Sequence, residues 1–150
     1  LRLIVKSVVD DFNSIYETKR GIKIEFVNKD RLKDYKIYGI ENRIEQIIAN
    51  LLDNSISFSA DKKKILVQLS KDNNKNIILK VVDEGQGFKE KDTDKIFKRF
   101  YSNRPEKFGE HSGLGLNIVK NLVDLHGGSI KASNNLNQKG ANVEIFFPKS

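Results

Sequence analysis

The chain has 150 residues, 38% of them hydrophobic and 31% charged, and a formal net charge of +7, as expected of one globular domain with its own core. It has no cysteine, which excludes a disulfide framework, a thiolate metal site and a cysteine nucleophile. No apolar run approaches the roughly 20 residues of a membrane span, so direct membrane insertion is not expected, and the scattered lysines lack the interleaved aromatic residues typical of a nucleic-acid-binding surface.

The first third of the chain predicts two amphipathic helices with a strand between them. Near the N-terminus, apolar residues recur at helical spacing at Leu1, Val5, Val8, Phe12 and Tyr16. This helix is expected to end at Gly21, because cations precede a glycine there. Residues 22–26 alternate and predict a strand, and residues 36–38 predict a second, short one. A second helical face, ending near Ser59, comprises Ile40, Ile44, Ile47, Ile48, Leu51 and Leu52.

The remainder predicts two hairpins separated by an irregular segment and a helix. Residues 65–82 form two apolar runs around a polar turn, and residues 129–147 repeat this pattern. Residues 88–112 lack periodicity, which in a compact domain indicates a functional lid or disorder. Residues 114–125 are periodic and predict a helix ending at a glycine pair. The sequence therefore predicts an α+β fold, a two-layer α/β sandwich with a mixed sheet and the long helices on one face.

The second predicted helix carries two amides on one side. Asn50 and Asn54 are four residues apart, so their side chains point the same way, off the apolar face. Amide oxygens can hold a magnesium ion that keeps several waters, and amides can bind phosphate oxygens. Taken alone, the pair fits a solvated helix face better than a ligand site.

A carboxylate and two glycines follow the strand that ends at residue 82. The alternation of that strand places Asp83 on its inward face, where a carboxylate must be hydrogen-bonded. The exocyclic amine of adenine would be a suitable partner. Gly85 and Gly87 permit a tight turn and the close approach of a flat ring to the backbone. An ordinary Asp-Glu-Gly turn is the alternative.

A second glycine cluster opens the helix at residues 114–125. It contains Gly113, Leu114, Gly115 and Leu116, and Ser112 is a candidate N-cap. Backbone amides and the helix dipole favour phosphate at such an end. The cluster is neither a Walker loop nor a dinucleotide fingerprint, and a flexible loop before a helix is the alternative.

In this order, the motifs resemble the catalytic ATP-binding domain of bacterial sensor histidine kinases, within the superfamily that includes gyrase-like, Hsp90-like and MutL-like ATPases. Residues 50–54 resemble its N box, residues 83–87 its first glycine box, residues 96–101 its F box and residues 112–116 its second glycine box. Residues 100–116 also resemble envelope-sensing kinases of alphaproteobacteria. The resemblance covers nearly the whole chain and implies a Bergerat-type ATP-binding fold over residues 1–150, with a lid at about 88–112.

The resemblance also implies roles for individual residues. Asp83 would contact the adenine amine beside the Gly85–Gly87 turn, Asn54 would ligate Mg²⁺, and Asn50 would help hold the phosphates of ATP. Residues Gly113, Leu114, Gly115 and Leu116, following Ser112, would wrap those phosphates. The F-box aromatic residues would anchor the lid, and these are Phe97, Phe100 and Tyr101.

The chain differs from the family pattern at the end of the second predicted helix and in the expected lid. The family often has Lys-Tyr at positions 57 and 58 and Gly at position 111, and often has Arg where this chain has Ser102. Phosphoryl transfer needs a cation near the γ-phosphate, and Arg104, held by the next residue, Pro105, is the candidate for it. Arg99 is the rival, although its position in the apolar patch favours a surface ion pair.

Residue 50 separates two kinds of function. Hydrolytic members of the superfamily place a Glu one helical turn before the metal-binding Asn, and an amide at that position cannot take a proton from water. Asn50 therefore favours phosphoryl transfer to an imidazole over an ATPase switch of the Hsp90 or MutL kind. A basic interaction module with a decayed site is a third possibility, against which the intact Asn54 and Asp83 argue.

The phosphoacceptor histidine is not expected in this chain. His126 precedes the glycine pair at a helix end and is expected to be structural, and His111 lies in the irregular segment. The resemblance thus implies a separate dimerisation and phosphoacceptor helical domain of the same kinase, and a downstream response regulator. The chain does not begin with Met, and we expect it to be the cytoplasmic part of a longer inner-membrane sensor kinase.

Overall fold

The computed structural model describes residues 1–28, 37, 39–59, 62–85, 87, 97, 115–135 and 140–148, with the side chain of Phe58 excepted. The elements are α1 (Arg2–Arg20), β1 (Lys23–Asn28), α2 (Glu41–Phe58), β2 (Lys64–Lys71), β3 (Ile77–Asp83), α3 (Gly115–Leu125), β4 (Ser129–Asn134) and β5 (Ala141–Phe147). Of the short strand expected at residues 36–38, only Ile37 is described, so that prediction lies outside the described residues.

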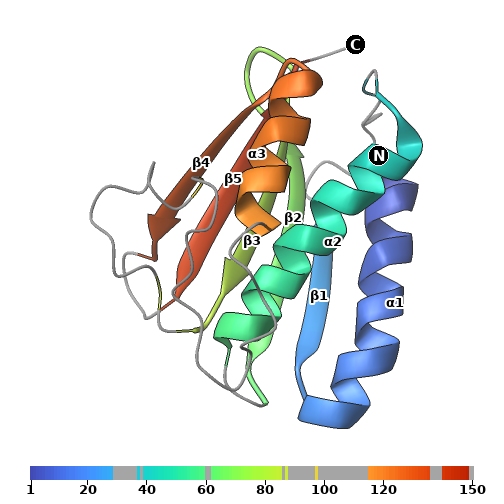
Figure 1. The fold of residues 1–150 in the computed structure, drawn as a ribbon, viewed down its shortest axis with the longest axis vertical. Helices are drawn as coiled ribbons and strands as arrows, with labels where there is room; N and C mark the ends of the chain where they lie inside the picture. The colour runs from blue at the N-terminus through green and yellow to red at the C-terminus, as the bar shows by residue number, and fades with distance from the viewer. Residues whose placement is uncertain are drawn as a thin grey trace.

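The five strands form one mixed sheet in the order β1-β2-β3-β5-β4. β1 pairs with β2 in parallel, and the other pairs are antiparallel. Figure 1 shows α1, α2 and α3 side by side on the same face of this sheet. The predicted α+β sandwich with a mixed sheet and helices on one face is confirmed, as are both predicted hairpins.

The core lies between the helices and the sheet. On β3, the inward positions Ile77, Leu79 and Val81 are buried and alternate with half-buried ones, because successive strand side chains point to opposite faces. α2 contributes most of the apolar face predicted for it, with Ile44, Ile47, Ile48, Leu51 and Leu52 each at most 2% exposed. Ile40, predicted for the same face, is instead the N-cap residue and is 55% exposed. Among the helices of the described ranges, none is long and apolar enough to cross a membrane.

The ends of α1 and α2 are joined by Arg20. α1 ends at Gly21, as predicted, and this glycine adopts the left-handed conformation with φ +65°. Immediately before it, Arg20 Nη1 donates to the carbonyl of Ile56 at 2.9 Å and Nη2 donates to that of Ser59 at 2.6 Å. These carbonyls lie at the C-terminal end of α2, where the last carbonyls lack i+4 partners, and that of Ile56 also accepts the N–H of Ser59 at 3.2 Å. Arg20 therefore caps the helix that carries Asn54.

Arg20→Ala is expected to lower the free energy of unfolding by about 1.5–3 kcal/mol, because hydrogen bonds from a charged donor to helix-end carbonyls are lost. Denaturant unfolding measures the change. The matched control is Arg43→Ala, which removes an exposed contact to Gln46 and should cost less than about 0.5 kcal/mol. Equal losses in the two variants would contradict the capping role.

Candidate functional site

Asp83 lies at the end of β3 and is only 2% exposed, as the strand alternation predicted. Its Oδ1 accepts hydrogen bonds from the backbone N–H of Gly85 at 2.9 Å and of Ala141 at 3.0 Å. The hydroxyl of Ser55, on α2, also bonds to this carboxylate. The carboxylate is thus held from the following turn, from β5 and from α2.

Burial dominates the electrostatics of this carboxylate. Desolvation raises the pKa of Asp83 above that of an ordinary aspartate, and the hydrogen bonds from Ala141, Gly85 and Ser55 oppose this rise. Oδ1 already accepts two amide protons, so Oδ2 is the better placed oxygen for a further donor. A buried, oriented acceptor of this kind suits a ligand that offers an N–H group.

The turn after β3 requires glycine at position 87. Gly87 has φ +79°, and a Cβ there would lie 2.7 Å from Oδ1 of Asn134. From the sequence, we attributed this glycine to a tight turn and to the approach of a flat ring to the backbone. The structure adds a close contact with Asn134 at the end of β4. Gly85 contributes its backbone N–H to Asp83, so both glycines help shape the surroundings of that carboxylate.

The two asparagines singled out on α2 lie one helical turn apart. Asn54 is 5% exposed and Asn50, one turn earlier, is half-buried, so neither is on a fully solvated face. Ser55 follows Asn54 directly and bonds to Asp83, which ties this part of α2 to the end of β3. The segment of α2 next to Asn54 therefore lies close to Asp83.

The amide of Asn54 fits one side of a magnesium shell. Among the described residues, no group of three or more His, Cys, Asp or Glu side chains could hold a metal ion. Mg²⁺ commonly keeps several waters and takes one or two protein oxygens together with substrate phosphates. The buried amide oxygen of Asn54 is chemically suited to be one of those protein oxygens.

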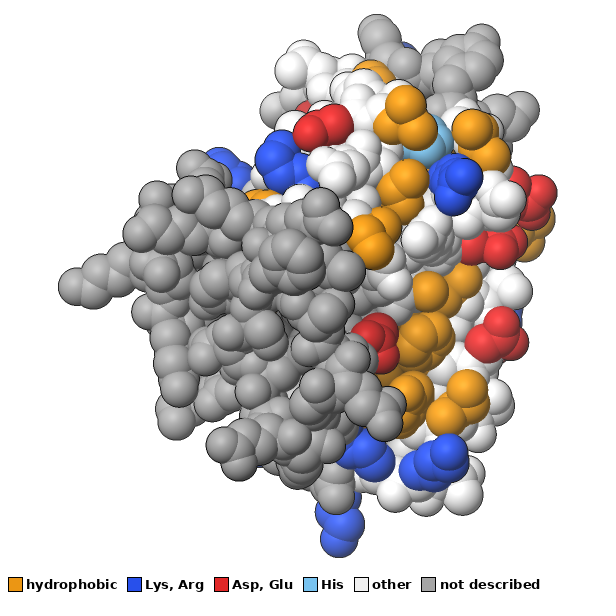
Figure 2. Space-filling model, in the orientation of Figure 1, with side chains coloured by type: hydrophobic (Ala, Val, Ile, Leu, Met, Phe, Trp, Pro, Cys, Tyr) orange, Lys and Arg blue, Asp and Glu red, His pale blue; other side chains and the backbone are white. Residues whose placement is uncertain are grey.

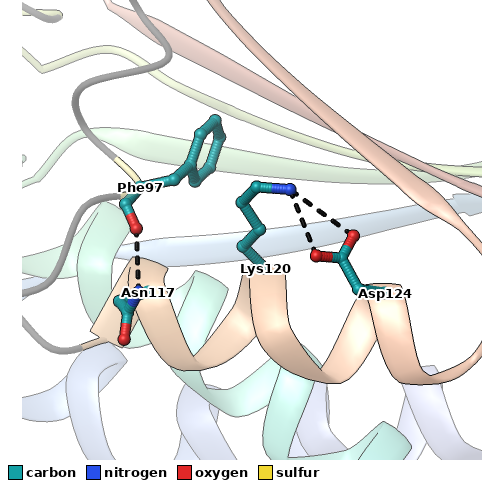
Figure 3. A network of polar contacts seen from close by, with 4 residues as sticks. All are labelled: Phe97, Asn117, Lys120 and Asp124. Atoms are coloured by element: carbon teal, nitrogen blue, oxygen red, sulfur yellow. Dashed lines mark hydrogen bonds and ion pairs between the residues drawn. The ribbon is translucent and has the colours of Figure 1, made fainter.

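α3 carries the described part of the second glycine box and contacts Phe97. The helix begins at Gly115, and Leu116 is buried. Phe97 is 5% exposed, and its carbonyl accepts a hydrogen bond from Nδ2 of Asn117 at 3.0 Å, as Figure 3 shows. This burial supports the expected role of Phe97 as an anchor. One turn further on, Figure 3 shows the exposed ion pair between Lys120 and Asp124.

Several predicted site residues lie outside the described residues. They are Phe100, Tyr101, Arg104, Ser112, Gly113 and Leu114, together with Arg99 and His111. The lid expected at about 88–112 is likewise outside them, except for Phe97. These assignments stay predictions.

His126 has the structural role that the sequence predicted. Its Nε2 accepts the N–H of Ile40 at 3.2 Å, so its Nδ1 carries the proton that bonds to the carbonyl of Leu122, 2.7 Å away. The imidazole thereby joins the end of α3 to the start of α2. Figure 2 shows hydrophobic side chains on the face of the molecule seen there, interspersed with acidic and basic ones.

Sequence reasoning missed the contacts of Ser55, Asn117 and Asn135. Ser55 directly follows Asn54 on α2, and its hydrogen bond to Asp83 could have been inferred only once the packing of α2 on the sheet was known. Asn135 donates to the carbonyl of Asp83 from a loop 52 residues away. No local pattern marks either residue.

Comparison with known proteins places this geometry in a family. Residues 39–150 match the model described as histidine kinase-, DNA gyrase B- and HSP90-like ATPases. The chain is 38% identical over 147 residues to the sensor protein ChvG of Agrobacterium fabrum, an alphaproteobacterium. This match covers 93% of this chain and 24% of ChvG. The chain thus spans about a quarter of the length of such curated relatives.

Solved structures agree with the family match. The catalytic domain of the histidine kinase ThkA has a TM-score of 0.82 at 25% identity, over 99% of this chain and 93% of that one. ThkA in complex with the response regulator protein TrrA shares the fold, with a TM-score of 0.81 at 22% identity, over 100% of this chain and 40% of that one. The chain therefore belongs to the family of histidine kinase-, DNA gyrase B- and HSP90-like ATPases, as an ATP-binding catalytic domain of the sensor histidine kinase type.

Proposed function

We propose that this chain binds Mg²⁺-ATP and donates the γ-phosphoryl group to a histidine on a separate dimerisation and phosphoacceptor helical domain of the same two-component kinase. The observation that carries the proposal is the buried carboxylate of Asp83, held by Gly85, Ala141 and Ser55 beside the asparagine side of α2. The carboxylate suits the adenine end of ATP, and the amides suit its phosphates and their metal ion.

Each described residue of the site has one task in this proposal. Asp83 accepts the exocyclic amine of adenine, next to the turn that contains Gly85 and Gly87. Asn54 ligates Mg²⁺, and Asn50 holds phosphate oxygens from one helical turn earlier. Bound Mg²⁺ would supply positive charge that neutralises the phosphates.

The lid residues and the second glycine box complete the proposed site. Gly113, Leu114, Gly115 and Leu116 would contact phosphates with backbone amides at the start of α3, after Ser112. Phe97, with Phe100 and Tyr101, would anchor the segment at about 88–112. The burial of Phe97 and its bond to Asn117 support the anchor.

Transfer fits this site better than hydrolysis does. Asn50 occupies the position from which a Glu would activate water, and its amide is not basic at neutral pH. An imidazole is already nucleophilic and needs no such base. The rival function, an ATPase switch of the Hsp90 or MutL kind, requires the base that this chain lacks at residue 50.

The relatives also support a proposal about the longer protein to which this domain belongs. We propose that residues 1–150 form one catalytic domain, because β1 pairs with β2 and α1 packs on the same core, ahead of the matched residues 39–150. A response regulator acts downstream, as the complex of ThkA with TrrA exemplifies. The domain would work on the cytoplasmic side of an inner-membrane sensor protein, without inserting into the membrane itself.

Calorimetric titration tests the binding half of this function. ATP should bind more tightly in the presence of Mg²⁺, and inosine triphosphate, which lacks the exocyclic amine, should bind more weakly than ATP. Equal affinity for the two nucleotides would contradict adenine recognition by Asp83. Affinity that is indifferent to Mg²⁺ would contradict the role of Asn54.

Arg104→Ala is expected to slow phosphoryl transfer at least about tenfold, a barrier increase of about 1.4 kcal/mol, while ATP binding stays nearly normal. A cation beside the γ-phosphate stabilises charge in the transition state, and adenine and magnesium contacts do not depend on it. Single-turnover transfer from labelled ATP to the cognate helical domain measures the rate. Arg99→Ala is the matched control. A parent-like rate for Arg104→Ala with a crippled Arg99→Ala would show that Arg99 provides the charge.

A further inference from the structure

The loop between β4 and β5 holds the main chain of Asp83 as well as its side chain. Nδ2 of Asn135 donates to the carbonyl oxygen of Asp83 at 3.0 Å. On the other side of the loop, the N–H of Ala141 donates to Oδ1 of Asp83 at 3.0 Å. Asn135 and Ala141 therefore hold both the main-chain carbonyl and the side-chain carboxylate of Asp83.

The loop is built so that Asn135 can reach Asp83. The N–H of Asn135 donates to the carbonyl of Gly140 at 2.9 Å, which closes the loop. Gly140 has φ +138°, and a Cβ there would lie 2.6 Å from Nδ2 of Asn135 and would overlap the carbonyl oxygen of Asp83. Only glycine at position 140 leaves room for the amide and the carbonyl to meet.

We infer that Asn135 is a positioning residue for nucleobase recognition, which acts by fixing the main chain of Asp83. The inference rests on the proposed role of Asp83 as the acceptor of the adenine amine. Hydrogen bonds weaken steeply as their angle departs from linear, so a small shift of the strand end would misdirect the carboxylate. β2 pairs with Asp83 on one side of β3, whereas the last pair with β5 is that of Val82 with Asn142, so on the β5 side the carbonyl of Asp83 is held by Asn135.

A purely structural role makes a different prediction. If Asn135 only closed the β4–β5 loop, its replacement would lower stability and weaken all nucleotides alike. If Asn135 positions Asp83, its replacement weakens ATP and spares nucleotides that lack the exocyclic amine. The ratio of affinities for ATP and inosine triphosphate distinguishes the two roles, because their phosphates and ribose are the same.

The test uses Asn135→Asp, which keeps the shape of the side chain and replaces the N–H donor by an oxygen that repels the carbonyl of Asp83. We expect affinity for ATP to fall about tenfold, the size of effect expected when the hydrogen bond between the misdirected carboxylate and the adenine amine is weakened, and affinity for inosine triphosphate to change less than about twofold. Asn74→Asp, in the exposed β2–β3 turn, makes the same charge change and should leave both affinities near the parent values. Asn135→Ser, which shortens the donor, is the milder variant to use if Asn135→Asp does not fold.

A double-mutant cycle with Asp83→Asn shows whether Asn135 acts through Asp83. In the Asp83→Asn background, Asn135→Asp should leave the ratio of the two affinities unchanged. A parent-like ratio in folded Asn135→Asp, with Asp83→Asn losing the preference for ATP, would overturn the positioning role and leave the proposed function intact. Equal binding of ATP and inosine triphosphate by the parent protein would overturn both.

Discussion

Asp83→Asn is expected to weaken ATP binding by about 1.5–3 kcal/mol, which is typical for loss of a charged hydrogen-bond partner. The amide that replaces the carboxylate offers a weaker, neutral acceptor to the adenine amine. The preference of the protein for ATP over inosine triphosphate should shrink or reverse, because an amide can donate to the oxygen that inosine carries in place of the adenine amine. Calorimetric titration of both nucleotides measures the change.

The same carboxyl group predicts a dependence on pH. Burial raises the pKa of Asp83, so the protonated form, which accepts hydrogen bonds poorly, accumulates at a higher pH than for an ordinary aspartate. Affinity of the parent for ATP should therefore fall as the pH is lowered through that raised pKa. Asp83→Asn should lack this part of the pH dependence.

The free energy of unfolding of Asp83→Asn shows whether a loss of ATP affinity reflects nucleobase recognition or impaired folding. A carboxyl whose pKa is raised by folding stabilises the protein below its unfolded pKa, and this contribution is lost as pH rises through the folded pKa. Asp83→Asn removes the desolvation of a buried carboxylate and keeps an oxygen that can accept from Gly85 and Ala141, so the variant should stay folded. The control Asp10→Asn removes an exposed ion pair with Lys6 and should leave ATP affinity unchanged. Unchanged ATP affinity in Asp83→Asn would refute the assignment.

Asn54→Ala is expected to remove the dependence of nucleotide binding on Mg²⁺. Asn54 is the buried amide of α2 proposed as the protein ligand of the metal, and alanine offers no oxygen in its place. Contacts with the nucleoside ring should persist, so adenosine affinity should stay near the parent value. Titrations of ATP with Mg²⁺ and with a chelator measure the difference.

The control for this variant lies on the same helix. Asn42→Ala removes an exposed amide in the first turn of α2 and should keep the full effect of Mg²⁺. Retention of that effect by folded Asn54→Ala would contradict the metal role. The variant Asn50→Glu provides a complementary comparison, because a carboxylate at this position supplies a base and should raise hydrolysis of ATP.

Local periodicity predicted the framework of the fold and the burial of Asp83. The alternation of residues 77–82 decided which face the next side chain would join, and the structure places Asp83 there at 2% exposure. The spacing of Asn50 and Asn54 likewise decided that both lie on one side of α2. These features depend on geometry within one element, which the sequence pattern determines directly.

The contacts that hold the carboxylate could not be predicted in the same way. Ser55, Asn135 and Ala141 meet Asp83 only because α2, β3 and the β4–β5 loop pack together in three dimensions. Gly140 illustrates the difficulty, since it reads as an ordinary loop glycine. Its need for glycine arises from a carbonyl far away in the sequence, at the end of β3.

The most direct test of the account is phosphoryl transfer from ATP labelled on its γ-phosphate, with Mg²⁺ and the helical domain of the same kinase. We predict that the label appears on a histidine of that domain, and that little free phosphate forms when the domain is omitted, because Asn50 provides no base for water. Rapid release of labelled phosphate by this chain alone, with no label on the helical domain, would contradict the kinase function and favour the ATPase switch.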